Sequence, residues 1–405
     1  MRLSASMLLG LLLGFSVASS AIADSLMPQV DPLVSSAPSA TLPLIIPAAP
    51  TTTAKSYILV NAVTGSVIAE KDPDAIVEPA SLTKLMALYV IFDGIKRGTI
   101  HLDDQVLIST KAWKMEGSRM FVKAGDYVPV DTLIQGVAIQ SGNDATVALA
   151  EHLAGSESSF VDLMNMQAQR LGMKNTHFED TSGLPSANHV TTARDLSILV
   201  RALIQDFPDN YHYFSEKWFE YANIKQPNRN RLLWDFEGAD GLKTGHTEAA
   251  GYCLVSSALR NSERLISVVL GEPSDSARTT DSIQLLTYGF RFYHTERLYE
   301  ANTPVTMVRV WQGEHKETAL GVTTPLVIST PTGANKDQMK IEIETQKQLN
   351  APIVKGQTYG TISITFQGKL LATAPLVALE DNPKGGVFRR VSDVVAAWFH
   401  KDEVK

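Results

Sequence analysis

Residues 79–92 read Pro79-Ala80-Ser81-Leu82-Thr83-Lys84, followed by the apolar run Leu85-Met86-Ala87-Leu88-Tyr89-Val90-Ile91-Phe92. Proline is tolerated at the start of a helix, and the run after it has no polar face, so we predict a helix that is buried on all sides. Residues three apart lie on one face of a helix, which brings Ser81 beside Lys84. Burial disfavours the charged form of an amine, so Lys84 is a candidate base for a Ser81 nucleophile.

A serine three residues before a lysine also arises by chance about once or twice in a chain of this length, so the pair is weak evidence when taken alone. Two further motifs follow it. Ser141-Gly142-Asn143 lies just before a predicted helix, and Lys243-Thr244-Gly245 lies before the strand that contains Cys253. The three motifs in this order, the first opening a buried helix and the third opening an edge-like strand, make chance a poor explanation and indicate one catalytic site.

The chain has 405 residues, of which 44% are hydrophobic and 20% are charged, as is typical of a globular protein with two or three domains. Arg2, the apolar stretch 7–17 and the small residues around Ile22 predict that residues 1–23 are a signal peptide, so we expect an exported mature chain. The net charge of -7 argues against nucleic acid as a partner.

Cys253 is the only cysteine, so the chain forms no intramolecular disulfide, and we expect a small buried side chain in a strand. The nine histidines show no metal-binding spacing such as His-Glu-x-x-His. We therefore expect neither a metal site nor a cofactor. No apolar run after the signal is long enough to cross a membrane.

Residues 24–54 are rich in Pro, Ser, Ala and Thr, which predicts an extended linker. Residues 55–295 form the predicted catalytic domain, with a hairpin at its start, helices in the middle and strands near its end. This order suggests one antiparallel sheet whose first and last segments are neighbours, with helices packed on it. The predicted strands are 56–60, 66–70, 249–258 and 264–270, and the predicted helices after the Ser81 helix are 144–154, 158–171, 193–206 and 281–294.

Residues 296–382 change character to short alternating runs separated by Gly, Pro and Asn, which predicts a small all-β domain. The expected strands are 305–311, 326–329, 339–345, 361–366 and 375–379.

Residues 383–405 form a predicted amphipathic helix after Pro383. At about 100° per residue its apolar side chains fall in a stripe roughly 140° wide, with charged residues opposite. Aromatic side chains beside cations are typical of a helix in a membrane interface, and the segment is too short and too charged to span a bilayer. The alternative is a helix that packs its stripe on the β domain. The stripe consists of Val387, Phe388, Val391, Val394, Val395, Trp398 and Phe399, opposite Arg389, Arg390, Asp393, His400 and Lys401.

Four segments carry a resemblance to a known family: residues 79–84, 140–144, 228–230 and 240–247. Over about residues 55–400 the chain resembles the low-molecular-mass penicillin-binding proteins that act as serine-type D-Ala-D-Ala carboxypeptidases, the peptidase S11 family. The resemblance implies an α+β fold, with a β-lactamase/transpeptidase-like catalytic domain followed by the all-β domain and the C-terminal amphipathic helix. It also implies peptidoglycan stem peptides ending in D-Ala-D-Ala as substrate and β-lactam antibiotics as covalent inhibitors.

The types of the site residues are consistent with acyl-enzyme chemistry, independent of the resemblance. Ser81 Oγ attacks the penultimate carbonyl, and Lys84, kept neutral by burial and by the positive charge of Lys243, takes its proton. Ser141 passes a proton to the leaving D-Ala amine, and Asn143 holds the substrate amide. Water then hydrolyses the acyl-enzyme.

The remaining site residues bind charge. By resemblance, the backbone N–H groups of Ser81 and His246 hold the oxyanion. We expect the substrate carboxylate to bind Lys243 and Thr244 and, by resemblance, Arg229. The alternatives are a His246 side chain that only packs, and an Arg229 that is an ordinary surface residue of a basic stretch.

Deacylation in class A β-lactamases uses a glutamate acting through water, and the chain has no such motif between Asn143 and Lys243. We therefore do not expect β-lactam hydrolysis as the main function. Two other functions remain open: a D,D-endopeptidase of the same superfamily, and a catalytically silent peptidoglycan-binding protein. For the carboxypeptidase we expect a role in peptidoglycan maturation and cell shape, at the outer, periplasmic face of the inner membrane.

Overall fold

The computed structural model describes residues 46–391 and 393. The predicted signal peptide and most of the predicted linker lie outside the described residues. The last residues of the predicted linker are packed on the folded chain. Ala54 is fully buried, the backbone N–H of Thr53 donates to Asp281 at 2.9 Å, and the Tyr288 hydroxyl donates to the Pro47 carbonyl at 2.9 Å. The packed structure therefore begins before Lys55, its predicted first residue.

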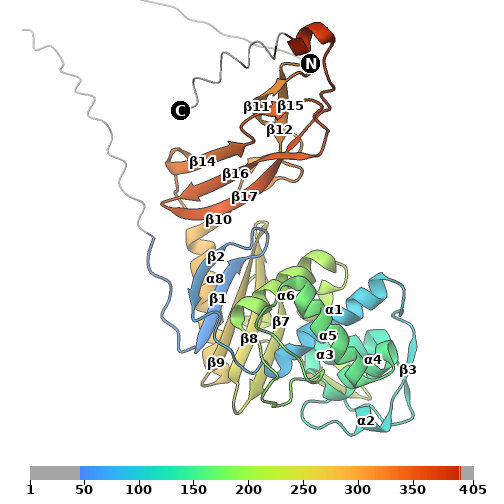
Figure 1. The fold of residues 1–405 in the computed structure, drawn as a ribbon. Coiled ribbons are helices and arrows are strands. Elements are labelled where there is room, and N and C mark those ends of the chain that lie inside the picture. Colours follow the sequence, from blue (N-terminus) through green and yellow to red (C-terminus); the bar gives the residue numbers. More distant parts are fainter. Residues whose placement is uncertain (1–45, 392, 394–405) are drawn as a thin grey trace, which may run out of the picture. The chain divides into compact units, whose positions relative to one another are not determined.

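A five-stranded antiparallel sheet with the order β2-β1-β9-β8-β7 forms the centre of the catalytic region (Figure 1). The first hairpin lies beside the last one, as the sequence predicts, because β1 pairs with β9 and places Tyr57 opposite Val269. β7 stands at one edge of the sheet. The strands are β1 (Ser56–Asn61), β2 (Val67–Lys71), β7 (Ala239–Thr247), β8 (Gly251–Arg260) and β9 (Glu263–Glu272).

The sheet separates two hydrophobic cores, since successive side chains of a strand point to opposite faces. Ile58 and Val268 join the core formed with α1–α6, whereas Leu59 and Val269 join the core formed with α8. Residues 83–92 of α1 are all buried, which confirms the predicted all-round burial of this helix. The helices are α1 (Thr83–Lys96), α2 (Thr110–Trp113), α3 (Val130–Gln140), α4 (Asn143–Ala154), α5 (Glu157–Leu171), α6 (Ala193–Asp206), α7 (Leu232–Asp235) and α8 (Asp275–Phe292).

Short elements connect these layers. These are the two-stranded sheet β3-β4, the hairpin β5-β6 and short 3₁₀ segments: β3 (Gln105–Leu107), β4 (Tyr127–Pro129), β5 (Trp218–Tyr221), β6 (Ile224–Pro227), η1 (Ala80–Leu82), η2 (Tyr211–Ser215) and η3 (Lys336–Gln338).

The C-terminal part is β-rich, as predicted, with a six-stranded sheet of order β14-β16-β17-β12-β11-β15 and a pair β10-β13. Ile362, Ile364 and Leu376 are fully buried in its own core. The strands are β10 (Tyr293–Tyr299), β11 (Pro304–Trp311), β12 (Glu317–Gly321), β13 (Leu326–Pro331), β14 (Met339–Thr345), β15 (Leu349–Asn350), β16 (Thr358–Phe366) and β17 (Lys369–Ala378).

Two predicted boundaries are wrong. The last helix of the catalytic region begins at Asp275 rather than at residue 281, because the side chain of Ser274 caps it by accepting the N–H of Ala277. It ends at Phe292, and the next residues form β10. Lys243-Thr244-Gly245 precedes β8, the strand that holds Cys253, as predicted, but it lies inside a separate strand, β7. Strand β7 was not predicted, and neither were the short strands β3 to β6 or strands β10, β12 and β15.

The predicted C-terminal helix is described over residues 383–391 and 393, of which 387–391 and 393 are helical, and its remainder lies outside the described residues. Val387, Phe388 and Val391 are 64%, 95% and 59% exposed. Asp393, from the charged side, is 5% exposed and accepts the backbone N–H of Gln312 at 2.7 Å. The charged side therefore faces the β-rich part, and the start of the apolar stripe faces away from it.

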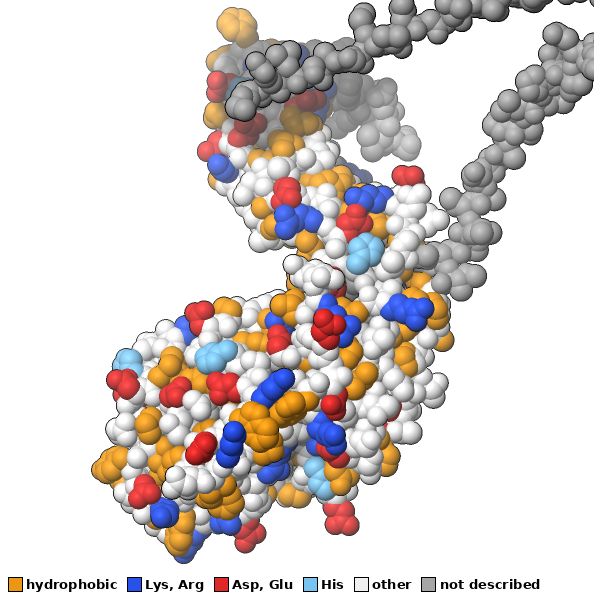
Figure 2. All heavy atoms as spheres, turned by 180° about the vertical axis from the view of Figure 1, so that it is seen from behind, with side chains coloured by type: hydrophobic (Ala, Val, Ile, Leu, Met, Phe, Trp, Pro, Cys, Tyr) orange, Lys and Arg blue, Asp and Glu red, His pale blue; other side chains and the backbone are white. Residues whose placement is uncertain are grey.

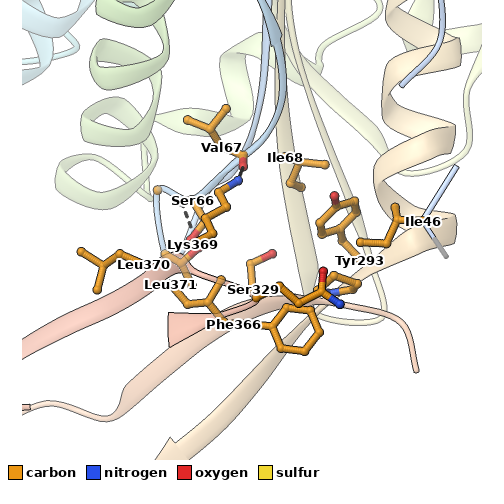
Figure 3. A pocket seen from close by; sticks show the side chains of 14 residues that line it. Ile46, Ser66, Val67, Ile68, Tyr293, Ser329, Phe366, Lys369, Leu370 and Leu371 are labelled. Atoms are coloured by element: carbon orange, nitrogen blue, oxygen red, sulfur yellow. Dashed lines mark hydrogen bonds between the residues drawn. The ribbon is translucent and has the colours of Figure 1, made fainter. Parts of the chain in front are cut away.

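A pocket of about 350 Å³ lies between residues 64–68 and residues 366–371 (Figure 3). Lys369 Nζ donates to the Val67 carbonyl at 2.9 Å. Ser329 Oγ in the same pocket is buried and has no hydrogen-bond partner among the described residues. On the face shown in Figure 2, Lys and Arg side chains are interspersed with Asp and Glu.

Candidate active site

The nucleophile turn comes from η1 and the start of α1. Ser81 lies in η1 after Pro79, and Thr83 begins α1. Lys84 is fully buried, and its Nζ donates to Ser81 Oγ at 3.1 Å and to the Ser182 carbonyl at 2.7 Å. The predicted Ser81–Lys84 contact is therefore present.

The Lys84 amine is held close to neutrality. Burial lowers its pKa from 10.5 to about 7; the charges of Asp180 and Asp144 act in the opposite direction, and that of Arg229 adds to the lowering. An amine with this pKa has a free lone pair at neutral pH and stands within reach of the Ser81 proton. This is the arrangement that a general base needs.

Ser141 sits between α3 and α4 in a left-handed conformation, with φ of 62°. This conformation is uncommon for residues other than glycine and here separates two consecutive helices. Ser141 Oγ is buried and has no hydrogen-bond partner among the described residues. A buried, unpaired hydroxyl at a pocket is available to a substrate.

Asn143 begins α4, and its Nδ2 donates to the Glu116 carbonyl at 2.6 Å. Its Oδ1 is buried without a partner among the described residues. Asp144 holds the facing loop by accepting the N–H groups of Met120 at 3.0 Å and Phe121 at 2.9 Å. Asn143 is close to the site but does not line the pocket described below.

The third motif lies on the edge strand β7, against the nucleophile turn. A side chain on Gly245 would lie 3.1 Å from the Pro79 carbonyl and from Leu82, so the small residue allows close approach. Lys243 is buried, and burial followed by the nearby Lys84, Arg229 and Arg278 holds its pKa well below the usual range. Lys243 does not line the pocket described below, and the contact of its amine with the substrate carboxylate stays a prediction.

A pocket of about 200 Å³ brings the motifs together. Five of the predicted site residues line this pocket: Ser81, Ser141, Arg229, Thr244 and His246. Ser118, Gly245 and Arg278 complete the lining.

No motif in the sequence pointed to Ser118 or Arg278. Arg278 belongs to α8, outside the predicted helix, and reaches across the sheet to donate from Nη1 to the carbonyls of Gly245 at 3.1 Å and Cys253 at 3.2 Å. These hydrogen bonds connect Arg278 to both β7 and β8, and Arg278 also lines the pocket.

Arg229 is held in place by its two asparagine neighbours. Asn230 Nδ2 donates to the Gly241 carbonyl of β7 at 2.8 Å, and Asn228 Nδ2 donates to the Glu216 carbonyl at 2.9 Å. Burial, with a further contribution from Arg278, lowers the pKa of Arg229. Arg229 is thus a pocket residue rather than a freely moving surface cation.

His246 is exposed, and its ring centroid lies 4.0 Å from that of Tyr252. Cys253 is buried on β8, as predicted, and burial raises the pKa of its thiol to about 11. A thiol with this pKa is a poor nucleophile. Among the described residues, no group of three or more His, Cys, Asp or Glu side chains is placed to hold a metal ion.

Comparison with known proteins agrees with this geometry. The peptidase S11 family, D-alanyl-D-alanine carboxypeptidase, matches residues 45–274, and the family of the penicillin-binding protein 5 C-terminal domain matches residues 293–384. The chain is 43% identical to the D-alanyl-D-alanine carboxypeptidase DacC of Escherichia coli, over 87% of this chain and 90% of that protein. It is 41% identical to DacA of the same organism, over 88% and 90%.

Solved structures show the same fold. Penicillin-binding protein 5 from Haemophilus influenzae is 40% identical with a TM-score of 0.80, covering 83% of this chain and 99% of that one. Penicillin-binding protein D2 from Listeria monocytogenes in its ampicillin-bound form is 28% identical with a TM-score of 0.56, covering 60% and 100%. These likenesses confirm the predicted α+β, transpeptidase-like fold followed by a β-rich domain. The chain therefore belongs to the peptidase S11 family of D-alanyl-D-alanine carboxypeptidases.

Proposed function

We propose that this carboxypeptidase removes the terminal D-alanine from peptidoglycan stem pentapeptides through an acyl-enzyme on Ser81. The observation that carries the assignment of residues is the 3.1 Å contact between Ser81 Oγ and the buried Lys84 Nζ, at the wall of a pocket that also holds Ser141, Thr244 and Arg229.

Acylation follows from this arrangement. Lys84 Nζ accepts the Ser81 proton as Oγ bonds to the penultimate carbonyl carbon, and the oxyanion binds the backbone N–H groups of Ser81 and His246. The tetrahedral intermediate collapses by breaking its C–N bond, and the proton held by Lys84 reaches the leaving amine through Ser141. Water then cleaves the ester and frees Ser81.

The carboxylate of the departing D-alanine requires fixed cations. Arg229 and Arg278, which line the pocket, and Lys243 on strand β7 supply the positive charge, and Thr244 supplies a hydroxyl. Asn143, whose Oδ1 has no hydrogen-bond partner among the described residues, holds the substrate amide.

Two observations bear on the alternatives. The intact Ser81–Lys84 pair and the unpaired Ser141 hydroxyl favour an enzyme over a silent binding protein. The pocket of about 200 Å³ with two guanidinium groups favours a small carboxylate-bearing leaving group over the longer chain released by an endopeptidase.

The direct test is mass spectrometry of a synthetic stem pentapeptide ending in D-Ala-D-Ala after incubation with the protein. We expect a product lighter by one alanine, and no cleavage of the same peptide ending in D-Ala-L-Ala. Release of longer fragments from cross-linked dimers, without action on the pentapeptide, would instead identify an endopeptidase.

We further propose export to the periplasm through residues 1–23 and attachment to the outer face of the inner membrane through residues 383–405, with a role in peptidoglycan maturation and cell shape. Support comes from the start of the C-terminal helix, where Val387, Phe388 and Val391 face away from the β-rich part. No helix among the described residues is long and apolar enough to cross a bilayer.

Truncation of the chain after Asp393 tests the anchor. Residues up to Asp393 contact the β-rich part, so they are retained, and the cut removes Trp398 and Phe399. We expect the protein to move from the membrane fraction to the soluble periplasmic fraction, with D-Ala release from a soluble peptide unchanged. A shorter chain that ends at Asn382 removes the whole predicted helix. Retention of the Asp393 truncation at the membrane would show that the helix packs on the protein instead.

A further inference from the structure

The turn formed by residues 180–183 lies directly behind the nucleophile. The Ser182 carbonyl accepts Lys84 Nζ at 2.7 Å, a shorter distance than that to Ser81 Oγ. Gly183 has φ of +83°, and a side chain there would overlap the Ala80 carbonyl. Only glycine fits both conditions. The turn therefore contacts the base and also the residue that precedes the nucleophile.

Asp180 shapes this turn with its carboxylate. Oδ1 accepts the N–H groups of Ser182 and Gly183, both at 2.6 Å, and Oδ2 accepts that of Leu184 at 3.2 Å. Burial opposes ionisation of Asp180, but His189 and these N–H groups hold its pKa below the usual value. Its oxygens are thus used by the backbone of the turn and not by a catalytic water.

His189 joins the turn to α1. Its ring is buried, and Nε2 lies 2.9 Å from Thr83 Oγ1, which itself donates to the Ala80 carbonyl at 2.8 Å. The Glu179 N–H donates to Nδ1 at 3.3 Å. Since Thr83 gives its one hydroxyl hydrogen to the Ala80 carbonyl, Nε2 carries the ring proton that points at Thr83, while Nδ1 also lies 3.6 Å from Asp180 Oδ2. A chain of hydrogen bonds therefore runs from His189 to the peptide just before Ser81.

We propose that His189 is a positioning residue for the Ser81–Lys84 pair, acting through Thr83 and through the turn that Asp180 shapes. This inference rests on the proposed function. His189 fixes the Ala80 carbonyl through the Thr83 hydroxyl. The turn presents the Ser182 carbonyl to Lys84. The distance between nucleophile and base is then set by contacts outside the three motifs.

The turn also places a charge near the base. Lys84 faces Asp180 and Asp144, which favour its protonated form, and Arg229, which opposes it. Loss of the Asp180 charge therefore lowers the pKa of Lys84 and moves the acidic limb of acylation to lower pH. A purely structural defect lowers the rate without moving that limb.

The experiment measures the second-order rate of acylation by a fluorescent penicillin against pH, with thermal unfolding in parallel. In His189→Phe both ring nitrogens are lost, and we expect about a 10²-fold slower acylation, the size of effect that a misplacement near 1 Å produces. In His189→Gln the amide nitrogen replaces Nε2, and we expect most of the rate to return. In Asp180→Asn the acidic limb should move to lower pH.

Matched controls separate position from folding. His177 is exposed on the same loop, so His177→Phe should acylate as the unchanged protein does. If His189→Phe does not fold, Thr83→Val, which removes only the hydroxyl, carries the test and should show the same loss. If both fold, their effects should be far from additive. Normal acylation by the folded variants, or no recovery in His189→Gln, would overturn the inference, whereas failure of the unchanged protein to react would count against the proposed function.

Discussion

Replacing Ser81 with alanine is expected to abolish both covalent labelling by penicillin and release of D-alanine, with a loss of at least about 10³-fold. The physical reason is that Lys84 Nζ, 3.1 Å from Ser81 Oγ, then has no hydroxyl to activate. The substitution removes one oxygen atom from a pocket wall, so the fold should be retained. Intact-mass measurement after incubation with penicillin and the pentapeptide assay read the two activities separately.

Ser118→Ala is the matched control, because Ser118 lines the same pocket and has no assigned role. Mapping of the penicillin adduct by peptide mass spectrometry should place it on residue 81 in the unchanged protein. An adduct on another residue, or a Ser81→Ala variant that still turns over pentapeptide, would remove Ser81 from the mechanism.

The second large effect is expected for Lys84→Arg, with acylation about 10²- to 10⁴-fold slower, the usual contribution of a general base. A guanidinium group cannot give up its proton at any accessible pH, so it cannot accept one from Ser81. In the unchanged protein the active form has Lys84 deprotonated. Acylation should therefore rise as pH increases through about 7, the pKa that burial gives this amine.

Lys96→Arg serves as control, since Lys96 is at the far end of the same helix and donates to the Asp206 carbonyl from an exposed position. It should leave the pH profile unchanged. If Lys84→Arg acylates at a near-normal rate, or if the rate of the unchanged protein does not change between pH 6 and 8, another group is the base.

The parts of the site that follow local sequence rules could be predicted. Ser81 and Lys84 are three residues apart at a helix start, and Ser141 precedes α4, so short spacing and the order of the three motifs together predict their chemistry. The pairing of the first hairpin with the last one was also predicted, because strands at both ends of a domain with helices between them fit one sheet, but the full order of the strands was not.

The parts that depend on distant packing could not be predicted. Arg278 reaches the pocket only because α8 packs on β9 and β8 in the folded chain, and no spacing in the sequence shows that. The burial of Lys243 beside Lys84 and two guanidinium groups, which lowers the pKa of its amine, likewise exists only in the folded chain. His189 follows a loop with no motif, and its role depends on the contact with Thr83.

The buried amine of Lys84 also has a consequence for folding. An unfolded chain holds a proton on this lysine below pH 10.5, whereas the folded chain resists protonation until about pH 7. The folded state therefore loses free energy relative to the unfolded state as pH falls from about 10.5 to about 7, by about 5 kcal/mol in all, and no further loss occurs below that range. The two hydrophobic cores must supply this difference. An apolar side chain at position 84 would give a more stable and inactive domain, so in this protein the strength of the fold and the reactivity of Ser81 are opposed.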